Sequence, residues 1–170
     1  AASKLAAEAL VQQAFLAHGQ TVITVRPFNH IGPGQTPDFA VPALTKRMVD
    51  AERKGATSIP VGNLSARRDF TDVRDVVRGY RMLIESGEPG TIYNVCSGRD
   101  VEIKEIAEEL LALTGATLNF ETDPTLMRPV EVPVLRGDPA RLQQATGWEP
   151  KISLGETLAD VLAYWRQRTD

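Results

Sequence analysis

Short segments rich in β-branched residues alternate with segments of helical periodicity along almost the whole chain. Strand character is found at 21–28, 57–62, 91–98 and 118–122, and helical periodicity at 3–18, 39–54, 73–86, 103–114 and from 153 onward. Strands that alternate with helices usually lie parallel in a sheet, because each helix carries the chain back to the edge from which the next strand starts. The pattern therefore predicts an α/β fold.

Capping signals support these helix boundaries. Asp72 is in position to cap the helix from 73, and Ser153 with Glu156 has the spacing of a capping box. Gly19 and Gly55 follow helical segments, where glycine readily adopts the left-handed conformation that ends a helix. The Gly/Pro-rich segment 29–38 predicts a loop.

Composition excludes several classes of protein. The 170 residues carry a formal net charge of -3, which argues against nucleic-acid binding. No apolar run approaches the roughly 20 residues of a membrane span, and no signal peptide is recognisable. Cys96 is the only cysteine, so we expect neither a disulfide within the chain nor a cysteine-rich metal site. A chain without disulfides is typical of a reducing compartment, so we expect a cytoplasmic location. We expect Cys96, Trp148 and Trp165 to lie in the core.

Five motifs occur in an order that resembles a known family. They are AASKLAAE at 1–8, RPFNHIGPGQ at 26–35, RRDFTDVRDVV at 67–77, YNVCSG at 93–98, and RPVEVPVLRGDPARLQQATGWEP at 128–150. Together they resemble the second half of the extended short-chain dehydrogenases/reductases that act on nucleotide sugars, and most closely those that reduce GDP-4-dehydro-6-deoxy-D-mannose. Each motif alone is loose, but their order is specific.

This resemblance implies the C-terminal part of an extended short-chain dehydrogenase, in which the last strands and helices of a Rossmann-type sheet are interleaved with a smaller α/β substrate lobe. Residues 1–30 would complete the cofactor domain, and 31–65 would start the substrate lobe. Residues 66–100 would return to the sheet, and 101–170 would form the C-terminal substrate-binding lobe.

Lys4 is the candidate catalytic and cofactor-binding residue. Taken alone, a lysine early in an apolar helix is usually solvated. The family's catalytic motif is Tyr-x-x-x-Lys, and the tyrosine would stand directly before Ala1. Residues four apart share a helix face, so the ammonium could lower the pKa of the tyrosine that protonates a carbonyl.

The resemblance also assigns roles to Pro27, Asn29 and His30. These three residues would lie beside the nicotinamide end of the cofactor. Asn29 would also hold the nucleotide sugar near its phosphates. An amide suits this role because it both donates and accepts hydrogen bonds. His30 has the alternative role of a structural histidine.

Two arginines and a glutamate are candidates for binding the nucleotide. Arg68 would bind the diphosphate, because a guanidinium fork matches phosphate geometry; Arg67 is the second choice, and both could be surface residues. Arg128 would add to the diphosphate site, and Glu131 would accept hydrogen bonds from the ribose hydroxyls. A salt bridge within the loop is the alternative for this last pair.

The expected activity is reduction of GDP-4-dehydro-6-deoxy-D-mannose to GDP-D-rhamnose with NADP or NAD as cofactor. No G-x-G-x-x-G follows a strand, so the main cofactor-binding loop is expected to be absent from this chain. We therefore expect an inactive half that needs an N-terminal half or a partner chain, and a homodimer formed through the first helix. A fragment of GDP-mannose 4,6-dehydratase or of another sugar-nucleotide epimerase/dehydratase, and a non-catalytic nucleotide-sugar-binding module, remain as alternatives.

Overall fold

The computed structural model describes residues 2–127 and 132–168, and it confirms the α/β class. The helices are α1 (Ala2–His18), α2 (Ala40–Lys54), α3 (Val73–Ser86), α4 (Ile103–Thr114), α5 (Ala140–Thr146) and α6 (Leu154–Gln167), with a 3-10 turn η1 (Pro124–Leu126). The strands are β1 (Thr24–Pro27), β2 (Asn29–Ile31), β3 (Ser58–Val61), β4 (Arg67–Asp72), β5 (Ile92–Val95), β6 (Asp100–Glu102), β7 (Asn119–Thr122) and β8 (Val134–Leu135).

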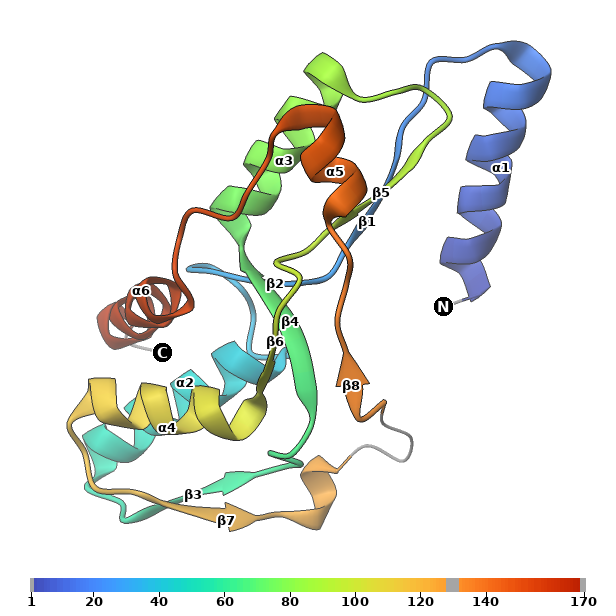
Figure 1. Cartoon of the computed structure of the whole chain (residues 1–170). Helices are drawn as coiled ribbons and strands as arrows, with labels where there is room; N and C mark the ends of the chain where they lie inside the picture. The colour runs from blue at the N-terminus through green and yellow to red at the C-terminus, as the bar shows by residue number, and fades with distance from the viewer. Residues whose placement is uncertain (1, 128–131, 169–170) are drawn as a thin grey trace.

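The strands form three small groups (Figure 1). β1 pairs with β5, β3 pairs with β7, and β4 pairs with β2 and β8, all in parallel. β6 runs antiparallel to β4, which the predicted parallel pattern did not include. The few residues between β5 and β6 include Gly98, whose φ is 79°. The partner of β6 is β4, and α3 and β5 lie between the two in the chain, so the alternation of strands and helices did not reveal this direction.

The prediction of a continuous loop over 29–38 was wrong at its start. Asn29, His30 and Ile31 form β2 and pair with Phe70 to Asp72 of β4. A three-residue strand beside glycine and proline has no periodicity that a sequence could reveal. Its hydrogen bonds come from a strand about 40 positions away in the chain.

Most predicted helix ends are confirmed. Asp72 caps α3 and accepts a hydrogen bond from the backbone N–H of Arg74 at 2.8 Å. Ser153 caps α6 through a hydrogen bond from the N–H of Glu156 at 3.2 Å. Gly55 ends α2 with φ 64°, as expected for a left-handed cap. These local signals explain why the helices begin and end where they do.

Two principal cores hold the elements together. One lies between α2, α4, β3 and β7, and it includes Met48, Ile106 and Leu110. The other joins β1 and β5 to α3 and α5, and both Tyr93 and Trp148 are buried in it. Trp165 of α6 packs against α2 in a smaller cluster. The expected burial of both tryptophans and of Cys96 is confirmed.

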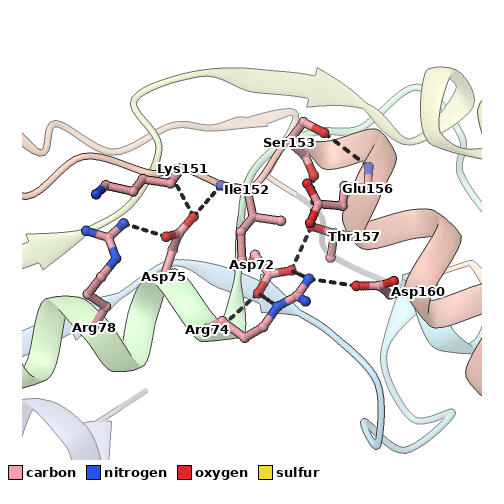
Figure 2. A network of polar contacts seen from close by, with 10 residues as sticks. All are labelled: Asp72, Arg74, Asp75, Arg78, Lys151, Ile152, Ser153, Glu156, Thr157 and Asp160. Atoms are coloured by element: carbon pink, nitrogen blue, oxygen red, sulfur yellow. Dashed lines mark hydrogen bonds and ion pairs between the residues drawn. The ribbon is translucent and has the colours of Figure 1, made fainter.

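Two buried carboxylates at the start of α3 attach α6 and the segment before it (Figure 2). Asp72 accepts a hydrogen bond from Thr157 Oγ1 at 2.8 Å, and Arg74 bridges Asp72 to Asp160 of α6. Asp75 accepts from the backbone N–H groups of residues 151 and 152 at 2.8 and 2.9 Å. These bonds bring the last part of the chain back against β4 and α3.

Helix α1 stands apart from both cores. None of its described residues is buried, and Leu5, Leu10 and Leu16 are each at least 66% exposed. Within the part of the chain that the structure describes, no helix combines the length and apolarity needed to cross a bilayer. The domain boundaries inferred from the resemblance remain predictions.

Candidate functional site

One large cavity lies where β1 ends and the chain turns into β2. Its volume is about 740 Å³, and its walls come from residues 26–31, α2 with the segment before it, residues 61–64, β4 and η1. Ligands of α/β proteins bind at the carboxyl ends of strands, and Pro27 is the carboxyl end of β1. The cavity is therefore the candidate site.

Four of the predicted site residues line this cavity: Pro27, Asn29, His30 and Arg68. The amide of Asn29 donates from Nδ2 to the backbone oxygen of Asp69 at 3.3 Å, which fixes its orientation. The ring Nδ1 of His30 lies 3.1 Å from the backbone oxygen of Phe28. Because a carbonyl can only accept, a hydrogen bond here requires a proton on Nδ1, and in the neutral ring Nε2 is then the acceptor.

Arg68 lines the cavity and Arg67 does not. Arg68 Nη1 donates to the backbone oxygens of Arg67 at 2.8 Å and Pro133 at 3.4 Å. Arg67 instead pairs with Asp100 at 2.5 Å and with Glu105 at 3.3 Å. Side chains of successive strand residues point to opposite faces, so only one of two adjacent arginines can face the cavity.

Two further polar residues of the cavity were not predicted. Gln35 donates from Nε2 to the backbone oxygen of His30 at 3.2 Å, and its Oε1 is buried without a hydrogen-bond partner among the described residues. Arg47 of α2 also lines the cavity. Its sequence neighbourhood, TKRM, holds no signal that separates it from Lys46.

Among the residues that the structure describes, cationic side chains outnumber carboxylates in the lining of the cavity, so the cavity is electropositive. Arg26, Arg47 and Arg68 line it, against a single carboxylate, Asp38. Arg26 pairs with Glu8 of α1, at 2.9 and 2.5 Å. This hydrogen-bonded pair lowers the pKa of Glu8 and raises that of Arg26. A lining with more cationic side chains than carboxylates suits an anionic ligand.

Lys4 is exposed on the first turn of α1 and does not line the cavity. It stands four residues before Glu8, so both side chains share one helix face. That face is the one that contacts Arg26 of β1. The structure therefore places Lys4 on the side of α1 that faces the cavity-lining strand.

Asp69 supports the site from behind. Its fully buried carboxylate accepts four hydrogen bonds: from the N–H and the hydroxyl of Ser97 at 2.8 and 2.6 Å, from the N–H of Gly98 at 2.9 Å and from the N–H of Gly137 at 3.2 Å. Its neighbours Arg68 and Phe70 line the cavity. The strand carrying Arg68 is thus tied to two distant loops. Arg128 and Glu131 lie outside the described residues.

A family model described as GDP-mannose 4,6 dehydratase matches residues 1–161. GDP-6-deoxy-D-mannose reductase of Pseudomonas aeruginosa is 41% identical over 170 residues, which are 99% of this chain and 56% of the relative. GDP-mannose 4,6 dehydratase 2 of Caenorhabditis elegans is 25% identical over 154 residues, covering 80% of this chain and 40% of the relative.

Solved structures agree with these relatives. RMD from Pseudomonas aeruginosa, solved with NADPH, superposes with a TM-score of 0.91 at 39% identity, over 99% of this chain and 56% of that one. UDP-glucose 4-epimerase from Thermotoga maritima, solved with UDP-glucose, gives 0.86 at 26% identity, over 96% of this chain and 52% of that one. The chain spans about half the length of the curated relatives it matches. It belongs to the GDP-mannose 4,6 dehydratase family, as its motifs predicted.

Proposed function

We propose that this chain supplies the nucleotide-sugar side of an NAD(P)-dependent reductase that converts GDP-4-dehydro-6-deoxy-D-mannose to GDP-D-rhamnose. The observation that carries the proposal is the electropositive cavity in which Arg68, Asn29 and His30 meet at the end of β1. The likeness to GDP-6-deoxy-D-mannose reductase supports the choice of base and sugar.

In this proposal Arg68 binds the diphosphate and Asn29 holds a phosphate oxygen or sugar hydroxyl. Two backbone carbonyls already orient the guanidinium of Arg68, so little side-chain entropy is lost when it binds an anion. Asn29 is held in the same way through Asp69. Pre-oriented donors of this kind bind a charged group more tightly than mobile ones. Arg128 and Glu131 keep their predicted roles at the diphosphate and the ribose.

The residues at the end of β1 fit the nicotinamide end of the cofactor. Pro27 and Phe28 offer apolar surface, and His30 and Gln35 offer polar atoms beside it. The cofactor supplies the hydride when bound. Lys4 would assist proton delivery to the C4 oxygen, from the face of α1 that Glu8 holds against β1.

Binding of GDP tests the nucleotide part of the proposal. Isothermal titration calorimetry should show binding of GDP and much weaker binding of guanosine, because the diphosphate provides the charge that Arg68 recognises. Arg68→Ala should weaken GDP binding by about tenfold or more. Arg81→Ala is the matched control, since Arg81 is 71% exposed on α3 and pairs only with Glu85 among the described residues. Equal affinity for GDP and guanosine would contradict the proposal.

A dehydratase of the same family remains the second candidate, favoured by the name of the matching family model. The two activities differ in their use of cofactor. A reductase oxidises one NADPH or NADH for each keto sugar reduced, whereas a 4,6-dehydratase removes water without net oxidation. Assays of cofactor oxidation with the keto sugar, in a preparation that turns over, therefore distinguish them. The reductase predicts stoichiometric oxidation, and conversion of GDP-mannose without it would identify the dehydratase.

A further inference from the structure

Helix α1 contacts the rest of the fold along one face. Figure 1 shows it apart from the other helices, and its half-buried residues include Glu8 and Phe15, which lie two turns apart on that face. Phe15 packs on Gly90, where a Cβ would meet its ring at 2.2 Å, and Glu8 pairs with Arg26 of β1. Lys4 stands one turn before Glu8, so the same face continues through it toward the start of the helix.

Arg26 binds both carboxylate oxygens of Glu8. Its Nε donates to Oε2 at 2.9 Å, and its Nη2 donates to Oε1 at 2.5 Å. A planar guanidinium makes such a two-pronged contact, whereas an ammonium is a point charge and does not. Among the described residues, no ion pair joins Glu8 to Lys4. The carboxylate therefore points to β1 and not along its own helix.

Without Arg26, Lys4 is the cation that Glu8 would meet. Residues four apart on a helix have Cβ atoms about 5–6 Å apart, close enough for an ion pair between their side chains. A lysine placed before a glutamate is the weaker of the two orders, so the guanidinium of Arg26 prevails in the folded chain. Removing the guanidinium removes this competition and leaves the carboxylate one turn from the ammonium.

The surroundings of Lys4 matter for the proposed reaction. An ammonium lowers the pKa of a neighbouring phenol because it stabilises the phenolate. A carboxylate bound to that ammonium offsets most of this effect, since the two opposite charges act on the phenol from nearly the same place. The phenol is then a weaker acid and delivers its proton more slowly. A pair between Lys4 and Glu8 would therefore slow the chemical step.

We propose that Arg26 is a positioning residue for this reaction: by holding the carboxylate of Glu8, it keeps that carboxylate away from the ammonium of Lys4. The inference rests on the proposed function, since it gives Lys4 a part in proton delivery. It assigns Arg26 a task other than contact with a ligand, although its side chain lines the cavity. One ion pair then holds α1 on β1 and also protects the charge that the reaction needs.

The first test measures the reactivity of Lys4 in the chain itself. Trace labelling with acetic anhydride, read by peptide mass spectrometry, compares the wild type with Arg26→Met, Glu8→Gln and the double variant. An ion pair keeps an amine protonated, so Lys4 should react about twofold more slowly in Arg26→Met and at the wild-type rate in the double variant. Arg81→Met is the matched control, since Arg81 is 71% exposed and pairs with Glu85 four residues on in the same helix.

The second test measures cofactor oxidation with the keto sugar, in a preparation that turns over. Arg26→Met should lower kcat by about tenfold, as expected if the proton donor becomes a weaker acid by about one pKa unit. Adding Glu8→Gln to Arg26→Met should restore kcat to within about threefold of the wild type, because it removes the competing carboxylate. Glu8→Gln alone should cost no more than about threefold, since the amide oxygen still accepts from Arg26.

The outcomes separate this inference from the proposed function. If the double variant is no faster than Arg26→Met, the pair with Glu8 only holds α1 or Arg26 binds the ligand, and the inference is overturned while the reductase stands. Slower labelling of Lys4 without a loss of kcat would also overturn it. A wild type that oxidises no cofactor overturns the proposed function, and the labelling still decides whether Arg26 keeps Glu8 from Lys4. If Arg26→Met does not fold, Arg26→Gln takes its place, with the same rescue expected.

Discussion

Replacing Asp69 with asparagine exchanges one carboxylate oxygen for an NH₂ group at a position that is 0% exposed. Each carboxylate oxygen accepts two hydrogen bonds: Oδ1 those of Ser97, and Oδ2 those of Gly98 and Gly137. The cheaper orientation of the amide points NH₂ at Ser97, whose hydroxyl can rotate to accept. Its backbone N–H cannot, so at least one buried donor loses its acceptor.

The expected cost follows from these contacts. An orphaned buried N–H costs about 1–3 kcal/mol, and the remaining bonds each lose about 1 kcal/mol when their acceptor is no longer charged. Relief from burying a charge offsets part of this loss. We therefore expect Asp69→Asn to lower the free energy of unfolding by about 2–4 kcal/mol, a large share of the roughly 5–15 kcal/mol of a typical domain.

Urea unfolding measures this change, with the fluorescence of the buried tryptophans as the signal. Asp50→Asn is the control, because Asp50 is 34% exposed and makes only an i,i+4 pair with Lys46 among the described residues. Such a pair contributes about 0.5 kcal/mol or less. If Asp69→Asn shifts the unfolding free energy no more than Asp50→Asn does, the reasoning about the buried carboxylate is refuted.

Three further predictions concern the same region. Gly137→Ala would place a Cβ 2.4 Å from Cys96 Sγ, so we expect the free energy of unfolding, measured in urea, to fall by about 1–3 kcal/mol. The double variant with Cys96→Ala should recover part of this loss, and strictly additive effects of the two substitutions would contradict the contact. Burial, aided by the charge of Asp69, raises the pKa of Cys96 to about 12. Iodoacetamide at about pH 8 should therefore modify Cys96 in urea and leave it unmodified in the folded chain, and the intact mass of the protein measures this difference. Burial of Asp72 opposes ionisation, yet hydrogen bonds from Arg74 and Thr157 prevail and hold its pKa below the ordinary 3.8. The stabilisation that Asp72 contributes is therefore complete above about pH 5 and is lost as the pH falls through its folded-state pKa. Asp72→Asn should flatten the acid side of a plot of unfolding free energy against pH. Wild-type and variant curves of equal steepness would contradict the assignment.

The sequence by itself determined the helices and the family. Helical periodicity and caps such as Asp72 and Ser153 act within a few residues, so their effect is visible in a short window of sequence. The burial of Trp148 and Trp165 followed from their size and apolarity. Pro27, Asn29 and His30 stand in one contiguous motif, so the turn after β1 brings them together whatever the rest of the fold does.

Only the tertiary structure decided which polar side chains meet. β2 and β6 have three residues each and depend on pairing with β4, whose residues are distant from both of them in the chain. The resemblance preferred Arg68 to Arg67 for the diphosphate, but the physical reason is tertiary: the orientation of β4 turns Arg67 toward three acids and Arg68 toward the cavity. Lys46 and Arg47 are separated in the same way by the face of α2 that packs on α6. The periodicity of a strand or helix predicts that the side chains of adjacent residues point in different directions. Which of the two reaches the cavity depends on contacts with residues far away in the chain.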